Sequence, residues 1–285
     1  MWCSLTPKRR LASACGKMAR LFDSHAHYYD ARFYEGGNTP DALLHTLFAG
    51  EVGTILNIGT SLENAGVVLS QAAKYPRMFA AIGIHPTDGQ GYADPAAALA
   101  ALEVLLADPA RRAAEKIVAI GEIGLDYHYP DTDKEKQAAL FEGQLTLAEK
   151  LNLPVIIHDR DAHGDCFETV LRHPRVRGVF HSFSGSAELA AELTRRGWYL
   201  SFSGVATFKN APRVRSAVAA TPNDRLLAET DCPYLAPEPH RGECNHSGFL
   251  TYTVAALAAV KGMSAQEMTD LTAGNACRLF DIPKE

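Results

Sequence analysis

The sequence predicts an α/β protein whose strands form a closed parallel (β/α)8 barrel, also called a TIM barrel. Two observations predict it. Eight short apolar runs recur along the chain, and a helical stretch follows each of them. The runs are continuously apolar, as strands covered on both faces require. An open, doubly wound sheet is the alternative, but eight repeated units suit a closed barrel better.

The predicted strands are short, continuously apolar segments. In chain order they are Arg20–Asp23, Thr54–Ile58, Phe79–Ile84, Ile117–Ile120, Val155–Ile157, Gly178–Phe180, Tyr199–Phe202 and Arg225–Ala228. The predicted helices are Pro40–Gly50, Leu62–Tyr75, Asp94–Glu115, Asp133–Leu151, Cys166–Arg172, Ala187–Arg196, Ala211–Ala220, Leu250–Lys261 and Ala265–Phe280. Because no linker-like or low-complexity stretch divides them, we expect residues 18–285 to form a single domain.

Residues 1–17 are expected to be a disordered or non-native extension. They lack the apolar segment of a secretory signal, and an organellar presequence would be longer and more strongly patterned. A strand pattern begins directly after Met18, so we favour Met18 as the start of the folded domain.

The composition is that of an ordinary globular protein, with 47% apolar and 21% charged residues. No apolar run approaches the roughly 20 residues of a membrane span, so no membrane partner is expected. The formal net charge of −5 does not by itself indicate a nucleic-acid partner, although bound metal can replace basic residues at phosphate. Six cysteines without C-x-x-C pairs indicate reduced thiols and a cytoplasmic location.

Side chains that bind metals follow five of the eight predicted strands. They are His25, His27, Glu122, His158, His181 and Asp231. His25 and His27 lie two residues apart on an extended segment, so both rings point the same way. Taken singly, each residue has an ordinary explanation, such as a surface histidine, a salt bridge or the acidic start of a turn. In a barrel, however, all of them reach the face where active sites form.

This mixture of imidazoles and carboxylates suits zinc or manganese, and magnesium less well because of the many nitrogens. The set has too many ligands for one tetrahedral site, so the sequence predicts two divalent metal cations.

The same segments resemble the TatD family of metal-dependent deoxyribonucleases. The resemblance runs in order from about residue 20 to the C-terminus. It rests on the segments Phe22–His27, Gly83–Pro86, Ala119–Tyr127, Leu153–His158, Arg160–Ala162, His181–Gly185, Ser201–Gly204, Thr207–Ala211, Glu229–Pro237 and Pro239–Gly242.

The resemblance implies a TIM barrel of the metal-dependent hydrolase type that cleaves phosphodiester bonds in DNA, often as a 3′–5′ exonuclease, with RNA as a further possible substrate. It places His25, His27, Glu122 and Asp231 on one metal, and Glu122, His158 and His181 on the second, with Glu122 as the bridge. It also places His85 in the substrate pocket and Arg241 near the substrate phosphate. No obligate protein partner is implied.

In the expected mechanism a water molecule activated by the two metals attacks phosphorus. Glu122 and Asp231 are the expected catalytic residues, and Asp231 orients the water and accepts its proton. Glu229 is expected to hold a metal ligand from outside. An ion pair at the barrel rim is a nearly equal alternative for Glu229.

The sequence departs from the family pattern in two places. Asp159 stands where Ser or Thr is usual. Asn245 matches the first residue of the usual Asn-Glu-Pro or Asn-Gln-Pro, but His246 and Ser247 do not match the two residues that follow it. All ligand positions are intact, so these departures concern substrate handling.

Three other functions are compatible with such a barrel. An amidohydrolase or lactonase often carries a carbamylated lysine at the end of strand four, where this chain has Glu122. A D-aminoacyl-tRNA deacylase would use the same metals on an ester. A barrel that has lost catalysis would serve as a binding protein, but the complete ligand set argues against it.

Overall fold

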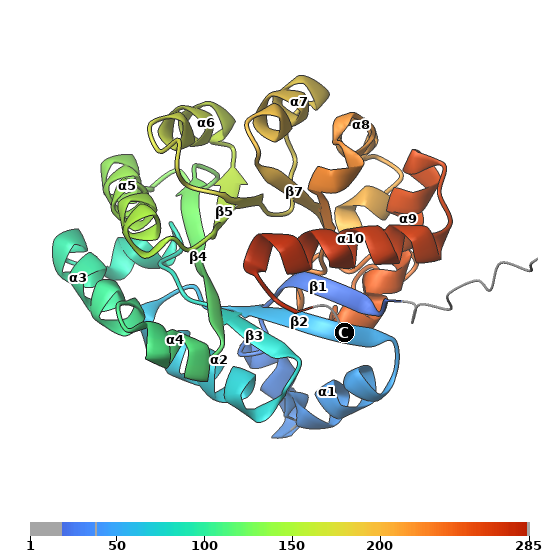
Figure 1. The fold of residues 1–285 in the computed structure, drawn as a ribbon, viewed down its shortest axis with the longest axis horizontal. Coiled ribbons are helices and arrows are strands. Elements are labelled where there is room, and N and C mark those ends of the chain that lie inside the picture. The colour runs from blue at the N-terminus through green and yellow to red at the C-terminus, as the bar shows by residue number, and fades with distance from the viewer. Residues whose placement is uncertain (1–18, 38, 284–285) are drawn as a thin grey trace, which may run out of the picture.

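Eight parallel strands form one sheet in the order β1 to β8 in the computed structural model, which describes residues 19–37 and 39–283 (Figure 1). The strands are β1 (Leu21–Ala26), β2 (Val52–Ile58), β3 (Met78–Ala81), β4 (Ile117–Asp126), β5 (Val155–Arg160), β6 (Gly178–Phe180), β7 (Tyr199–Phe202) and β8 (Leu226–Ala228). A parallel bridge between Ala26 and Cys232 brings the two ends of the sheet together. The predicted barrel is confirmed. The extension predicted for residues 1–17 lies outside the described residues.

Ten α-helices of the described chain surround these strands (Figure 1). They are α1 (Pro40–Ala49), α2 (Leu62–Lys74), α3 (Pro95–Leu106), α4 (Pro109–Ala114), α5 (Lys134–Leu151), α6 (His163–Leu171), α7 (Ala187–Arg195), α8 (Pro212–Ala220), α9 (Leu250–Lys261) and α10 (Ala265–Phe280). No helix in the described ranges has both the length and the apolar character needed to cross a membrane.

Local sequence signals explain where several helices begin. Ser61 and Ser264 form capping boxes with Asn64 and Glu267, so side chains satisfy the first free N–H groups of α2 and α10. Asp133 caps α5 in the same position, by accepting a hydrogen bond from the backbone N–H of Lys136.

The single helix predicted over Asp94–Glu115 is wrong, because the segment forms the two helices α3 and α4. The Asp108 side chain accepts a hydrogen bond from the backbone N–H of Ala110 at 2.8 Å, and Pro109 occupies the first turn of α4. A proline in that place starts a helix but cannot continue the preceding one, since it has no N–H to donate.

The fourth and fifth strands are longer than predicted, and this places the polar residues inside the sheet. β4 continues to Asp126 and pairs with β5 up to Arg160, with Gly124 opposite His158. Glu122 and His158 are therefore strand residues, held by the hydrogen-bond ladder of the barrel wall.

Alternate strand residues fill the barrel interior, and α10 covers one end of it. Phe22, Leu56, Ile156 and other buried strand residues pack with Leu279 and Phe280 of α10. The Phe22 and Phe280 rings stack with centroids 6.5 Å apart. Because α10 closes this end, the opposite, C-terminal ends of the strands are left to form the site.

Gly124 allows β4 to approach β5 beside His158. Its φ of +140° lies in the region that favours glycine, and a Cβ atom there would lie 2.0 Å from the carbonyl oxygen of His158. A side chain at this position would push apart the two strands that carry Glu122 and His158.

We predict that Gly124→Ala lowers the free energy of unfolding by about 2–4 kcal/mol, because backbone strain and overpacking add. Urea unfolding followed by circular dichroism would measure it. Gly66→Ala is the matched control, since Gly66 lies in α2 with nothing within 4 Å of an added Cβ. It should leave stability unchanged or raise it by about 0.5–1 kcal/mol. Wild-type stability of Gly124→Ala would contradict the strain argument.

Candidate metal centre

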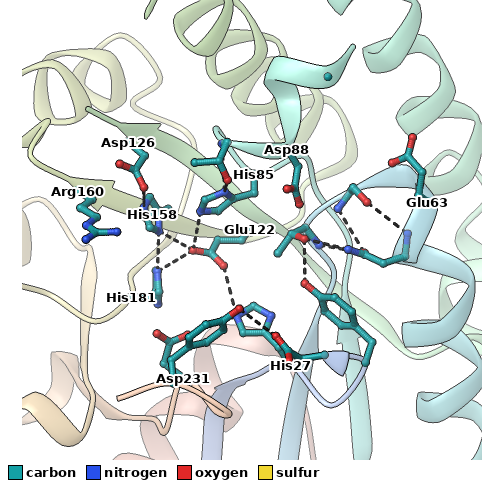
Figure 2. A pocket seen from close by; sticks show the side chains of 18 of the residues that line it. His27, Glu63, His85, Asp88, Glu122, Asp126, His158, Arg160, His181 and Asp231 are labelled. Atoms are coloured by element: carbon teal, nitrogen blue, oxygen red, sulfur yellow. Dashed lines mark hydrogen bonds and ion pairs between the residues drawn. The ribbon is translucent and has the colours of Figure 1, made fainter. Parts of the chain in front are cut away.

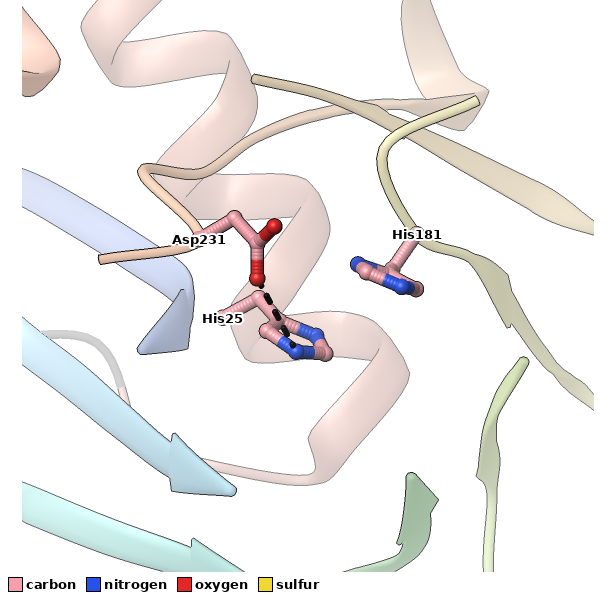
Figure 3. A group of neighbouring side chains, drawn as sticks. All are labelled: His25, His181 and Asp231. Atoms are coloured by element: carbon pink, nitrogen blue, oxygen red, sulfur yellow. Dashed lines mark ion pairs between the residues drawn. The ribbon is translucent and has the colours of Figure 1, made fainter. Parts of the chain in front are cut away.

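The structure brings the six predicted metal ligands together at the C-terminal end of the barrel; Figure 2 labels five of them, and Figure 3 labels the sixth, His25. β1 carries His25 and is followed by His27, β4 carries Glu122, and β5 carries His158. His181 directly follows β6, and Asp231 lies three residues after β8. The residues lie in five separate stretches of the chain, and only the closure of the barrel makes them neighbours.

Glu122 lies at the centre of the cluster, with its side chain only 4% exposed. Its Oε2 atom lies 3.1 Å from Nε2 of His25 and 3.6 Å from Nε2 of His27. Its Oε1 atom lies 2.7 Å from Nδ1 of His158 and 2.8 Å from Nε2 of His181. Each oxygen of one carboxylate thus faces its own pair of imidazoles, which is the arrangement expected of a carboxylate bridging two cations.

Asp231 completes the group around Oε2 of Glu122. Its Oδ1 atom lies 3.4 Å from Nε2 of His27 and 3.7 Å from Nε2 of His25. Figure 3 shows His25 between Asp231 and His181, and the rings of His25 and His181 stack with centroids 4.0 Å apart. His25, His181 and Asp231 form one set of ligand atoms close enough to share a cation, and His25, His27 and Glu122 form another.

Three of the imidazoles are oriented by hydrogen bonds on their outer side. Nδ1 of His27 donates to the carbonyl oxygen of Ile58 at 2.9 Å. Nε2 of His158 donates to Asp126 at 3.1 Å, and Nδ1 of His181 donates to Glu229 at 3.3 Å. A neutral imidazole carries one N–H, so the nitrogen that faces Glu122 in each ring presents a lone pair.

These lone pairs converge, and this fits a divalent cation. Nδ1 of His158 and Nε2 of His181 lie 3.2 Å apart, both beside Oε1 of Glu122. Nε2 of His25 and Nε2 of His27 lie 3.0 Å apart beside Oε2. Acceptors at such distances repel one another unless a proton or a metal lies between them. Imidazole and carboxylate together are the donor set of zinc and manganese sites.

The charges in the cluster also favour positive charge at its centre. Burial raises the pKa of Glu122, but His181, His25 and His85 together hold it well below its usual range. Burial lowers the pKa of His181, but the carboxylates of Glu122 and Glu229 hold it well above the usual value. The centre therefore favours positive charge between these groups, whether protons or cations supply it.

His85 belongs to the same cluster as well as to the cavity wall. Its Nε2 atom lies 3.6 Å from Oε1 of Glu122, and Nδ1 is hydrogen-bonded to Oγ1 of Thr87 at 2.8 Å. Burial, and then His158, lower the pKa of His85 to about 3. A neutral imidazole in this place is a candidate ligand beside Glu122 and His158, in addition to the substrate-pocket role expected from the sequence.

Asp126 is a site residue that the sequence argument missed. It is buried, and its carboxylate holds the ring of His158. The signal was available, since Asp126 is four residues after Glu122 and alternation in a strand places both on the same face. Glu229 holds His181 similarly, and its Oε1 atom also accepts the backbone N–H of Ser182 at 2.7 Å.

Asp23 ties the end of β1 to the segment after β8. Its Oδ1 atom accepts the backbone N–H groups of His25 at 3.3 Å and Thr230 at 2.9 Å. Its Oδ2 atom accepts the hydroxyls of Thr230 at 2.6 Å and Ser247 at 2.7 Å. Burial raises the pKa of Asp23 to about 6 despite these bonds. Ser247, one of the departures from the family pattern, thus helps to position His25 and Asp231.

A cavity of about 750 Å³ opens over the cluster and is rich in carboxylates. Among the described residues, Arg160 is the one Lys or Arg that lines it. Arg241 lies outside this lining, with its guanidinium carbon 4.0 Å from the centre of the Phe208 ring. Asp159, the other departure from the family pattern, accepts a hydrogen bond from Nδ1 of His163 at 2.7 Å.

Comparison with known proteins gives a consistent result. The family described as TatD related DNase matches residues 22–281. YabD of Bacillus subtilis, named an uncharacterised metal-dependent hydrolase, is 39% identical over 265 residues, covering 92% of this chain and 99% of YabD. The metal-dependent hydrolase TatD of Mycobacterium tuberculosis, also named uncharacterised, is 34% identical over 272 residues, covering 92% and 98%.

A solved structure shares the fold as well. The crystal structure of YjjV, a TatD homologue from Escherichia coli, aligns with a TM-score of 0.83 at 32% sequence identity. The alignment covers 93% of this chain and 100% of YjjV.

We predict that the centre couples cation binding to stability. Zinc or manganese at about a hundredfold excess over Kd should stabilise the fold by about 3 kcal/mol, or roughly 5–10 °C in Tm, and a chelator should reverse the gain. Glu122→Gln should lose most of this shift, because an amide cannot bridge two cations. Differential scanning calorimetry with metal analysis would measure both effects.

Glu63→Gln is the matched control for Glu122→Gln. Glu63 is an exposed carboxylate that lines the same cavity, where it accepts a hydrogen bond from the Tyr92 hydroxyl at 2.6 Å. It should keep the wild-type response to metal. An equal shift in Glu122→Gln and wild type would rule out the bridging position.

Proposed function

This chain belongs to the TatD family of metal-dependent hydrolases, and from that premise we propose that it cleaves phosphodiester bonds in DNA as a two-metal 3′–5′ exonuclease. The observation that carries the proposal is the shared carboxylate of Glu122, with a pair of imidazoles at each of its oxygens. We assign one divalent cation to His25, His27, Glu122 and Asp231, and a second to Glu122, His158 and His181. Zinc or manganese suits this donor set better than magnesium.

The chemistry that bound divalent cations supply at such a centre is activation of a water molecule and neutralisation of phosphate charge. Asp231 lies at the cavity wall beside His27, where its carboxylate orients the attacking water and accepts its proton. The Glu122 carboxylate lies between the His25–His27 pair and the His158–His181 pair, so it would fix the distance between the two proposed cations. Asp126 and Glu229 keep the rings of His158 and His181 in place, which makes them positioning residues.

The charge of the cavity supports a reaction that depends on cations. Asp30, Glu63, Asp88 and Asp126 line it together with Glu122 and Asp231, whereas Arg160 is the one Lys or Arg among the described lining residues. An anionic phosphodiester would be repelled by such a wall unless bound cations changed its sign. Arg160 lines the cavity together with His158, and we assign it to a phosphate oxygen of the substrate.

A comparison of three substrates tests the proposal. The metal-loaded protein is incubated with single-stranded DNA labelled at its 5′ end, with a lactone and with a D-aminoacyl ester. We expect the DNA to shorten from its 3′ end and a chelator to stop the reaction. Turnover of the lactone or the ester without turnover of DNA would refute the nuclease assignment. The free thiols of Cys166, Cys232 and Cys244 agree with the cytoplasmic location that we propose.

We predict that Arg160→Ala raises KM for DNA about tenfold and leaves bound metal unchanged, because it removes a charged hydrogen-bond donor from the cavity. Arg241→Ala should also keep its metal and weaken binding of DNA, but only about twofold to fivefold, since Arg241 lies on Phe208 outside the cavity lining. Steady-state kinetics together with metal analysis would separate the two variants. A larger loss in Arg241→Ala than in Arg160→Ala would reverse this assignment.

A further inference from the structure

A second cavity of about 340 Å³ lies against the metal centre. We refer to it as the small cavity, and to the cavity of about 750 Å³ as the large cavity. The two cavities share five lining residues, which we call the partition: His158, Arg160, His181, Asp231 and Tyr234. Because three of the proposed ligands belong to the partition, a phosphate held at the metal centre would have one cavity on each side of it.

The walls of the two cavities come from different parts of the barrel. Beyond the partition, residues 27–129 line the large cavity and residues 159–235 line the small one. In Figure 2 the labelled members of the partition lie on the left, and Asp88 and Glu63 of the large-cavity wall lie on the right. A linear substrate could therefore cross the metal centre from one cavity to the other.

The small cavity has a largely uncharged wall. Beyond the partition it is lined by the hydroxyls of Ser182, Ser184 and Ser203 and by the apolar side chains of Phe183, Val205 and Leu235, among others. The carboxylate of Asp159, also in this wall, is paired with His163. Such a wall suits a group with an aromatic ring and hydroxyls, not a phosphate. The volume lies at the lower end of the about 300–1,000 Å³ typical of small-molecule pockets.

Tyr234 stands between the two cavities and is held rigidly, although 45% of its surface is exposed. Its hydroxyl donates to Oδ2 of Asp30 at 2.9 Å, and its backbone N–H donates to the carbonyl oxygen of Asp231 at 2.9 Å. The guanidinium carbon of Arg32 lies 3.9 Å from the ring centre, and Arg32 is itself paired with Asp30. A fixed, exposed aromatic ring beside a cation is the usual platform for bases of single strands.

We propose that the small cavity binds the 3′-terminal nucleoside of the substrate, and that Tyr234 separates this nucleoside from the strand in the large cavity. The proposal rests on the phosphodiesterase function proposed above. The oxygen of water bonds to phosphorus, and the bond from phosphorus to the 3′ oxygen of the penultimate nucleotide breaks. That oxygen takes a proton, and the terminal residue leaves as a 5′-mononucleotide. Because the small cavity has room for one nucleoside, cleavage is confined to the strand end.

The test fills the small cavity with Ser184→Trp, since Ser184 is an exposed residue of its wall. Two substrates are compared in the metal-loaded protein: single-stranded DNA and methyl p-nitrophenyl phosphate, whose methyl group needs almost no room. We expect the ratio of mononucleotide release to p-nitrophenol release to fall about tenfold or more, because an occupied subsite excludes the nucleoside. Ser216→Trp is the matched control, since Ser216 is exposed in α8 and lines neither cavity. It should keep the wild-type ratio.

A second comparison tests the role of the Tyr234 ring. Tyr234→Ala should lower the ratio of mononucleotide release to p-nitrophenol release about tenfold. Tyr234→Phe should keep this ratio within about threefold of wild type, because stacking needs the ring and not the hydroxyl. Equal losses in both variants would assign the effect to the bond with Asp30 and overturn the separating role.

The outcomes distinguish this proposal from the one on which it rests. A wild-type ratio in Ser184→Trp, or internal fragments instead of mononucleotides from the wild-type protein, would overturn the terminal subsite and leave phosphodiester cleavage intact. Failure of the wild-type protein to hydrolyse either substrate would overturn the proposed function itself.

Discussion

The buried carboxylate of Glu122 is the constraint on which the site depends. An ionised carboxylate inside a barrel costs several kcal/mol unless opposite charge or strong hydrogen bonds surround it. Strands β1, β5 and β6 supply imidazoles to both of its oxygens. Three of those imidazoles, on His27, His158 and His181, already use their outer N–H groups on Ile58, Asp126 and Glu229, so in their neutral form they face Glu122 as acceptors. The arrangement is electrostatically balanced when positive charge lies between them, and the pair of cations that we propose would supply it.

The barrel is shaped around this requirement. Asp23 and the Ala26–Cys232 bridge join the first strand to the segment after the last, so His25, His27 and Asp231 meet at the seam of the sheet. Gly124 lets β4 and β5 come close enough for Glu122 and His158 to pair. At the other end, α10 packs into the barrel interior, which leaves one face for chemistry. Packing and function are therefore separated along the barrel axis, as in other TIM barrels.

In the function that we propose, the acidic large cavity and the small cavity, whose wall beyond the partition is largely uncharged, contact different parts of the substrate. Acidic side chains next to a phosphate site repel an anionic substrate when no cation is bound. Binding of such a substrate therefore depends more strongly on cations. The small cavity offers hydroxyls and apolar surface where a neutral group fits. Tyr234 borders both cavities and the turn that carries Asp231, so one short segment would link the proposed cleavage to the position of the proposed strand.

The sequence by itself determined the fold class and indicated six side chains that the structure brings together at one end of the barrel. Continuous apolar runs predict buried parallel strands, and the position of His25, Glu122, His158 and Asp231 at or near the ends of such runs predicts one shared face. The bridging role that we propose for Glu122 came from resemblance to a family, since no local pattern states that two distant histidine pairs will face the same carboxylate.

Tertiary structure decided what depends on distances between strands. The register of β4 against β5 placed Asp126 behind His158, and the same register carried Glu122 into the strand and not beyond its end. Pro109 divided a helix that looked continuous by periodicity. The division of the site into two cavities, with Tyr234 between them, arises from residues that lie on or after all eight strands. The two cavities have no signature in a linear sequence, because they exist only once closure of the sheet has fixed how far apart the strand ends lie.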